Sequence, residues 1–256
     1  MDYYEVKDPS GEVKDIDRLS RWEGKWHKAY NRKPGFHLPH VNPNLEAQYG
    51  KTFLAPQNEP ILLPLCGKTI DLIWLSREKG HKSVWGVEGV RKAIEELKED
   101  YLPELRCVEQ EDSSYDLWTT TTASSDDDHN SQLQNEKTIS IICNDFFEIS
   151  PTKIASSLFG SAFDRGALVA VAPHSRGQYV TKLDSLLRPG GQILLVTVAR
   201  RIADDDVGPP FSITPNDVNN LFGQPYHYNI QLVGEHETDL KGEDATEFVF
   251  VLTKQK

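Results

Sequence analysis

The chain has 256 residues, a length that allows one large α/β domain to bury a substantial core. Its 39 acidic side chains outnumber 28 lysines and arginines, and the net charge of −11 argues against nucleic acid or a membrane surface as a partner, because no basic block offsets it. Three cysteines without paired metal-ligand spacing indicate reduced thiols, and no signal-like segment or apolar run of about 18 residues occurs, so we expect a cytoplasmic protein without a metal or a membrane span.

A polar N-terminal stretch leads into a helical pattern at residues 19–30, where Leu19, Trp22, Trp26 and Tyr30 fall near one face. After residue 60, short apolar strand patterns alternate with amphipathic helix patterns. The strand patterns cover residues 60–65, 83–88, 138–143, 167–172 and 192–199, and the helix patterns cover residues 69–79, 90–100 and 176–191. This alternation is typical of a mainly parallel sheet with helices on both faces.

The C-terminal end follows a different pattern. Two strand patterns, at residues 229–237 and 246–254, are separated by a segment too short for a crossover helix, which predicts an antiparallel hairpin. The expected fold is therefore α/β, with a seven-stranded, mostly parallel sheet, helices on both faces and an antiparallel C-terminal edge hairpin.

One segment, residues 109–137, is rich in Ser, Thr and Asp. After a short strand pattern at residues 115–122 it has no apolar periodicity, so we expect a mobile acidic loop at about residues 123–136. The loop would be an insertion in a single domain that spans residues 1–256.

The letters Gly67-Lys68-Thr69 are those with which a nucleotide phosphate loop ends. Such a loop also needs a glycine five positions before Gly67, where this chain has Leu62. The motif is therefore not expected to hold a nucleoside triphosphate.

Gly67 ends the first strand pattern of the alternating region, and Glu88 ends the second one 21 residues later. A spacing of about 20 residues is expected for an acid that binds ribose hydroxyls over the carboxyl ends of the strands. Because the loop has one glycine where a pyrophosphate would need three, the ligand should carry a nucleoside without a pyrophosphate. S-adenosylmethionine meets this requirement, and its sulfonium would suit aromatic side chains.

Five segments of the chain resemble the thiopurine S-methyltransferases and their bacterial, halide and thiocyanate methyltransferase relatives. The segments are RWEGKWHKAYNRKPGFH (21–37), LPLCGKTIDLIWL (63–75), VWGVEGV (84–90), FDRGALVAVAP (163–173) and GPPFSITPNDVNNLFG (208–223). The resemblance runs from Trp22 to about Phe222 and implies a Rossmann-like methyltransferase fold with an N-terminal lid at about residues 15–45. It also implies S-adenosylmethionine as cofactor, with S-adenosylhomocysteine as product.

The resemblance assigns a role to each matching position on the cofactor side. Trp22 and Trp26 would cover the methionine and sulfonium end, and Glu88 would bind the ribose. The positions that would contact the cofactor are Trp22, Trp26, Leu65, Gly67, Glu88, Asn144, Asp145, Phe146 and Arg165. Of these, Leu65 and Gly67 would act through the backbone, and Asn144, Asp145 and Phe146 would enclose the adenine.

On the acceptor side, the resemblance implies that Arg165 faces both the cofactor carboxylate and the substrate. Residues lining the substrate side would be Phe36, Pro209, Pro210 and Phe211. Arg165 would stabilise an anionic sulfur or receive a substrate carboxylate, and Asp164 would orient it. An aromatic thiol is substantially ionised near neutral pH, so no strong general base is expected. No second substrate-facing arginine is evident beyond Phe222.

The expected activity is methyl transfer to the sulfur of an aromatic or heterocyclic thiol such as a thiopurine, by a monomer that acts on small molecules. Two alternatives remain. The enzyme could transfer the methyl group to halide, thiocyanate or a metalloid, or the protein could bind S-adenosylmethionine without catalysing a reaction. The individual residues have structural alternatives too. Glu88 could be a solvated acid, Trp22 and Trp26 a core stripe, Arg165 half of an ion pair and Cys66 a packing residue. His37 and His40 lack a third metal ligand.

Overall fold

The computed structural model describes residues 3–7, 13–28, 34, 36–108, 115–121, 137–150, 157–201, 208–224, 226–240 and 242–255. The acidic loop expected at 123–136 lies outside the described residues, as do Tyr30 and part of the expected lid.

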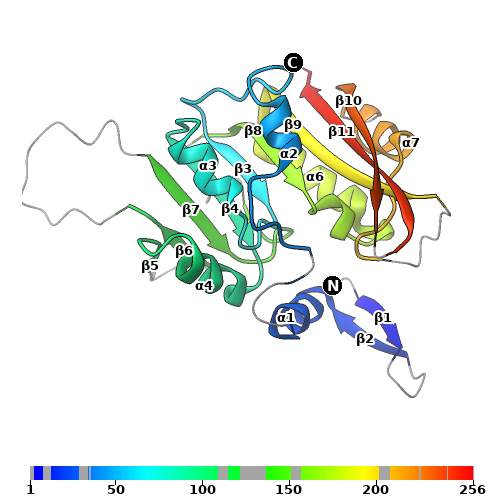
Figure 1. Cartoon of the computed structure of the whole chain (residues 1–256), viewed down its shortest axis with the longest axis horizontal. Helices are drawn as coiled ribbons and strands as arrows, with labels where there is room; N and C mark the ends of the chain where they lie inside the picture. The colour runs from blue at the N-terminus through cyan, green and yellow to red at the C-terminus, as the bar shows by residue number, and fades with distance from the viewer. Residues whose placement is uncertain are drawn as a thin grey trace, which may run out of the picture.

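The described part of the chain forms a nine-stranded sheet in the order β10-β11-β9-β8-β3-β4-β7-β6-β5 (Figure 1). The five central strands, from β9 to β7, are parallel, and an antiparallel pair flanks them on each side. In chain order the strands are β3 (Ile61–Pro64), β4 (Ser83–Glu88), β5 (Arg106–Val108), β6 (Asp116–Thr119), β7 (Thr138–Cys143), β8 (Phe159–Arg165), β9 (Leu187–Arg200), β10 (Tyr228–Asp239) and β11 (Asp244–Lys254). The chain leaves β3 toward β4 and later returns to its other side with β8, so a topological switch point lies at β3.

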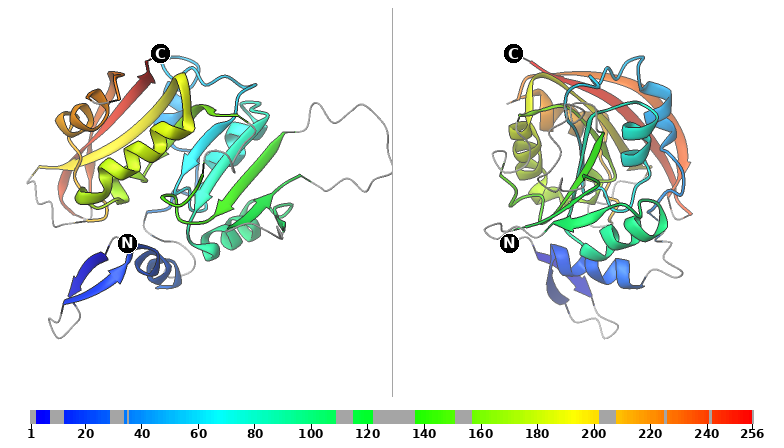
Figure 2. Two further views of the ribbon diagram at one scale, coloured as in Figure 1. Left: turned by 180° about the vertical axis from the view of Figure 1, so that it is seen from behind. Right: turned by 90° about the vertical axis from the view of Figure 1, so that its left-hand side faces the viewer.

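Helices pack on both faces of the sheet (Figure 2). On one face, α6 (Arg176–Leu186) and the short helix α7 (Pro215–Val218) bury Tyr179, Leu183 and Val218. The other face is covered by α2 (Pro43–Gln48), α3 (Asp71–Arg77) and α4 (Arg91–Asp100), which bury Leu45, Leu72 and Leu97 among others. Apolar side chains recur at helical spacing in α4 and α6, which is why each buries one face. No helix in the described ranges is long and apolar enough to cross a membrane.

The N-terminal segment forms a separate two-stranded hairpin, β1 (Tyr3–Lys7) with β2 (Val13–Asp17), followed by α1 (Arg18–Lys28). Both views place α1 beyond the ends toward which the parallel strands point (Figures 1 and 2). These are the carboxyl ends, where ligands bind in open α/β sheets.

Two expectations about the strands need correction. The sheet has nine strands rather than seven, because β5 and β6 form an antiparallel pair on the β7 side. The strand expected at 167–172 is wrong: the strand is β8, Phe159–Arg165, and the apolar run forms the 3-10 helix η3 (Leu168–Ala170). Gly166, at φ +88°, ends the strand, and the Asp164 carboxylate accepts hydrogen bonds from the N–H groups of Ala167 and Leu168.

The turns after η3 complete the fold. A second 3-10 turn, η4 (Pro173–Ser175), leads into α6, and a π-helical turn, η5 (Asn219–Gly223), follows α7. Thr214 and Asp217 form a capping box at the start of α7. This explains why polar residues precede Val218 in the segment TPNDV.

Candidate active site

The first loop of the site follows β3. Leu65 and Gly67 both have positive φ, at 45° and 55°, so the chain turns sharply, and the Cys66 N–H donates to the Val87 carbonyl at 2.9 Å. A Cβ on Gly67 would lie 3.2 Å from the Trp26 ring. Glycine is therefore favoured here both by the backbone conformation and by the close approach of the indole.

Glu88, at the end of β4, is buried, with 7% of its surface exposed. One carboxylate oxygen accepts from the Gly67 N–H and the other from the Val90 N–H, each at 2.8 Å. Burial raises the pKa of Glu88 to about 7, although these N–H donors act in the opposite direction. Glu88 thus joins the two loops at which a ribose is expected, and the alternative of a solvated surface acid is wrong.

Lys68 is turned away from this loop. Its ammonium is buried and bonds to Glu96 at 2.9 Å and to Asp100 at 3.1 Å, both on α4. A lysine held in this way cannot also extend toward a phosphate chain on the loop. Its side chain ties the Gly67 loop to α4 instead.

Helix α1 lies against three loops. Trp26 is 3% exposed and packs with Val90 and Ala93, and a Cβ on Gly89 would meet the Leu19 side chain at 2.4 Å. Arg21 donates from Nη2 to the Gly208 carbonyl at 2.9 Å, a contact that links the helix to the segment before α7. Helix α1 therefore spans from the two cofactor-side loops to the 208 loop.

An aromatic cluster joins α1 to the segment that follows it. The Phe36 ring meets Trp22 and Trp26 edge-on, with ring centroids 5.4 Å and 5.3 Å apart. Phe36 remains 38% exposed. The cluster places an apolar surface beside the Gly67 loop, on the segment that was expected to form a lid.

The loop after β7 runs beside Glu88, since the Asn144 N–H donates to the Glu88 carbonyl at 3.1 Å. Asn144 and Asp145 are partly exposed at this edge. Phe146 needs correction as an adenine contact: its side chain is fully buried and packs on Tyr179, with ring centroids 5.0 Å apart. Phe147, its neighbour, is the partly exposed aromatic of this loop.

Arg165 and Asp164 end β8 and point to opposite faces of the sheet, as alternation along a strand requires. Arg165 is partly buried and donates from Nη1 to the Phe36 carbonyl at 2.9 Å, and it forms no ion pair within 4.0 Å among the described residues. Burial lowers the pKa of Arg165, and the carboxylates of Glu247 and Asp71 partly offset this.

Asp164 does not orient Arg165, so that expectation is wrong. Its carboxylate is fully buried and accepts from the Tyr179 hydroxyl at 2.6 Å, in addition to the two N–H groups after β8. Burial raises the pKa of Asp164 to about 6. The side chain fixes the turn after β8 from the opposite face, and it influences Arg165 only through the backbone.

The 209–211 segment lies next to the Arg21 contact. Pro209 and Phe211 are buried, Phe211 at 5% exposure, and Pro210 is partly exposed. Of the residues expected to line the substrate side, Phe36, Pro210 and Arg165 therefore have accessible surface. Phe211 packs on Ala172 and so anchors the 209–211 segment to the core.

A polar group near Arg165 was not anticipated from the sequence. Asp71 accepts from the Asn42 N–H at 2.8 Å and from the Thr69 hydroxyl at 2.7 Å. Glu247, on β11, accepts from the Asn44 side chain at 2.7 Å. The available signal was a glutamate within the apolar alternation of TEFVFVLTK, on the face that the sheet buries.

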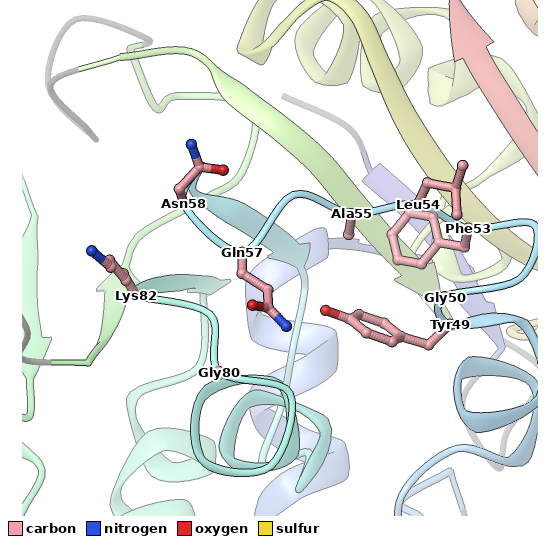
Figure 3. A pocket seen from close by; sticks show the side chains of 9 residues that line it. All are labelled: Tyr49, Gly50, Phe53, Leu54, Ala55, Gln57, Asn58, Gly80 and Lys82. Carbon is pink, nitrogen blue, oxygen red and sulfur yellow. The ribbon is translucent and has the colours of Figure 1, made fainter.

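A cavity of about 530 Å³ lies elsewhere, among residues that include Tyr49, Phe53, Gln57 and Lys82. In Figure 3 the Tyr49 hydroxyl and the Gln57 amide point toward each other, and the Lys82 side chain extends away. Gln57 and Lys82 precede β3 and β4, so the cavity is at the amino ends of the parallel strands. It is thus at the opposite end of the sheet from the Gly67 and Glu88 loops. In the described ranges, no group of three or more His, Cys, Asp or Glu is placed to hold a metal.

Two methyltransferases are among the solved structures that this fold resembles. The Burkholderia thailandensis 1,6-didemethyltoxoflavin-N1-methyltransferase, with bound S-adenosylhomocysteine, superposes with a TM-score of 0.57 at 15% identity, covering 99% of this chain and 95% of that one. Magnesium protoporphyrin IX methyltransferase from Synechocystis, with bound S-adenosylmethionine, gives 0.53 at 11% identity, with 92% and 97% covered. The fold is that of the S-adenosylmethionine-dependent methyltransferases.

Sequence comparison narrows the class. Residues 18–251 match the model of the thiopurine S-methyltransferase family, and the chain belongs to that family. It is 35% identical to the thiopurine S-methyltransferase of Aliivibrio fischeri over 203 residues, covering 78% of this chain and 81% of that one. The Vibrio parahaemolyticus enzyme of the same name is 31% identical over 229 residues, with 89% and 93% covered. The chain is thus an enzyme that transfers methyl groups from S-adenosylmethionine.

Proposed function

We propose that this enzyme methylates the sulfur of a small aromatic or heterocyclic thiol, such as a thiopurine. The observation that carries the proposal is Arg165, a partly buried guanidinium with one hydrogen bond, to Phe36, among the described residues. Its remaining N–H groups suit an anionic acceptor. The named function of the relatives supports the same acceptor.

The residues around Gly67 fit the cofactor. Glu88 is a buried carboxylate whose pKa of about 7 reflects incomplete compensation of its burial, and two ribose hydroxyls would supply further donors. Gly67 and Leu65 offer backbone groups to the amino acid part, and Asn144, Asp145 and Phe147 lie at the edge where the adenine would be held. When bound, S-adenosylmethionine supplies an electrophilic methyl group that a sulfur nucleophile can take by direct displacement.

Arg165 holds the acceptor sulfur as its thiolate in this proposal. A guanidinium stays protonated at neutral pH, even with a pKa lowered by burial, and so can stabilise the anion before transfer. Its hydrogen bond to the Phe36 carbonyl fixes the direction of the fork. No general base is required for a thiol that is already ionised.

The lid residues exclude water from the reacting atoms. Trp22, Trp26 and Phe36 form one aromatic cluster over the Gly67 loop, and Phe36 also bonds Arg165 through its carbonyl. The cluster therefore connects the cofactor side to the acceptor side. Closing a site in this way strengthens the interaction of Arg165 with an anion, because the local dielectric constant falls.

A panel of methyl acceptors tests the proposal. We expect methyl transfer to thiophenol and to a thiopurine, with weaker or no transfer to iodide and thiocyanate. Calorimetric binding of S-adenosylhomocysteine establishes that the cofactor site is intact in the sample. Binding without transfer to either thiol, or preferred transfer to iodide or thiocyanate, would contradict the thiol proposal.

The remaining expectations are part of the same proposal. We propose a monomeric, single-domain enzyme. A cytoplasmic location would agree with the three free cysteines, Cys66, Cys107 and Cys143, in the described structure. Burial raises the pKa of Cys66 and that of Cys143, to about 12 for Cys143, so both thiols stay protonated. This supports a packing role for Cys66.

A further inference from the structure

The strand register places Glu247 near Arg165. Arg165 on β8 is opposite Val196 on β9, and Val196 is opposite Val249 on β11. Glu247 is two residues from Val249 and therefore lies on the same face of the sheet as Arg165. Burial of Val196 and Val249 in one cluster confirms that this face is the one covered by α2 and α3.

The two acids close to Arg165 are held differently. Both Asp71 oxygens accept hydrogen bonds, from the Asn42 N–H and from the Thr69 hydroxyl. In the described structure, Glu247 has one partner at one oxygen, the Asn44 side chain. Glu247 is also only partly buried, so a carboxylate oxygen remains available at the acceptor side of Arg165.

The charges around Arg165 do not suit a doubly charged acceptor. The carboxylates of Glu247 and Asp71 act on Arg165 and partly offset the effect of burial on its pKa, so this guanidinium lies among acids. A thiolate brings one negative charge, which would interact directly with the Arg165 guanidinium. A carboxylate on the acceptor would add a second negative charge beside Glu247, and beyond Phe222 the sequence has no second arginine to receive it.

We propose that Glu247 determines acceptor specificity, favouring thiols that present a neutral hydrogen-bond donor and disfavouring thiols that carry a carboxylate. A ring or amide N–H of the acceptor donates to Glu247 while the sulfur faces Arg165. This inference rests on the proposed thiol methylation. It also replaces the expectation that Arg165 receives a substrate carboxylate.

Two thiols of the same shape test the inference. 4-Mercaptobenzamide and 4-mercaptobenzoate differ in one group, an N–H donor in the first and a negative charge in the second. We expect the wild type to have the higher kcat/KM with the amide. Glu247→Gln should shift the amide-to-carboxylate ratio of kcat/KM toward the carboxylate by about tenfold, which corresponds to about 1.4 kcal/mol. Glutamine keeps the oxygen that accepts from Asn44.

Glu235→Gln is the matched control. Glu235 is an exposed glutamate on β10 opposite Phe248, which faces the other side of the sheet, so this variant removes the same charge without altering the acceptor side. Its ratio should equal that of the wild type. Calorimetric binding of the two thiols in the presence of S-adenosylhomocysteine should show the same shift in Glu247→Gln, independently of turnover.

Thermal melting establishes that each variant is folded. Should Glu247→Gln melt below the assay temperature, Glu247→Asp, which withdraws the charge by one methylene, should shift the ratio part of the way. Transfer by the wild type with an unchanged ratio in the folded variants would overturn the role of Glu247 alone. Failure of the wild type to methylate any thiol would overturn the proposed function, and this inference with it.

Discussion

The pKa of Glu88 makes cofactor binding depend on pH. Two ribose hydroxyls would donate to this carboxylate, so they bind the ionised form better than the protonated form. With a pKa of about 7, the ionised fraction rises from about one tenth at pH 6 to about nine tenths at pH 8. We therefore expect the affinity for S-adenosylhomocysteine to rise about tenfold over this range, or about 1.4 kcal/mol.

Glu88→Gln removes the titration. The glutamine oxygen can accept from one of the two N–H groups of Gly67 and Val90, and its amide nitrogen faces the other. One buried N–H is left unpaired, which should lower the free energy of unfolding by about 1 to 3 kcal/mol. The variant should bind the cofactor more weakly at pH 8 and show no rise between pH 6 and pH 8.

Calorimetry at pH 6 and pH 8 measures the affinity for S-adenosylhomocysteine. The proteins compared are the wild type, Glu88→Gln and the control Glu78→Gln. Glu78 is an exposed acid at the end of α3. Titration of the cofactor's own groups is common to all three proteins and cancels in the comparison. The same pH dependence in Glu88→Gln as in the wild type would refute the assignment of Glu88 to the ribose.

The free energy of unfolding of the unliganded enzyme should fall as pH rises, whereas the affinity for the cofactor should rise. The pKa of Glu88 is raised in the folded state from its ordinary value of 4.5 to about 7, so the folded state holds more protons than the unfolded state between these values. The free energy of unfolding should therefore fall as pH rises from about 4.5 to about 7 and become level above that, for the contribution of this group. Chemical denaturation of the wild type and Glu88→Gln across this range isolates that contribution.

Three further predictions concern single residues. Lys68→Met should destabilise the fold by about 1.5 to 3 kcal/mol in chemical denaturation, because Glu96 loses one of its two lysine partners and keeps only Lys92. The variant should bind no ATP, and we expect none to bind the wild type. Tyr179→Phe should lower the free energy of unfolding by about 1 to 3 kcal/mol, because it removes the hydroxyl that donates to Asp164, while kcat changes little. A large loss of kcat in a stable variant would indicate that Asp164 takes part in the reaction. Arg165→Lys should lower kcat/KM for an anionic aromatic thiol by about tenfold, about 1.4 kcal/mol, and an equal loss with a neutral small thiol together with a lower melting temperature would indicate a structural arginine.

The parallel strands and the position of Glu88 were predictable because both depend on local pattern. Apolar runs bounded by turn residues mark β3, β4 and β7. The distance along the chain from Gly67 to Glu88 is set by one helix, two short loops and β4 itself. β8 was not, because FGSAFDR contains glycine, serine and two charged residues, whereas the apolar run after it is more strand-like in composition. The strand ends at Gly166, and the hydrogen bonds that Asp164 accepts at the start of the apolar run favour a 3-10 helix there.

Which of two neighbouring side chains faces the core was also beyond the sequence. Phe146 and Phe147 are alike in composition, and packing on Tyr179 selects Phe146 for the interior. Glu247 lies 82 residues after Arg165 in the numbering, 247 against 165, and approaches it only through the register of β8, β9 and β11. The glutamate in TEFVFVLTK is a local signal for an acid on the buried face, but its closeness to Arg165 depends on sheet pairing and cannot be seen in the local sequence.

The three contacts of α1 have a kinetic consequence. Leu19, Arg21 and Trp26 reach different loops from a single helix, so the helix cannot leave one loop while keeping its geometry on the other two. If this helix acts as a lid, we therefore expect it to open in one cooperative event and not by gradual loosening. Gly24 lies in the middle of α1 with open space around it, and glycine weakens a helix by about 1 kcal/mol relative to alanine. Gly24 therefore lowers the intrinsic stability of the helix, and we expect it to make such an opening easier.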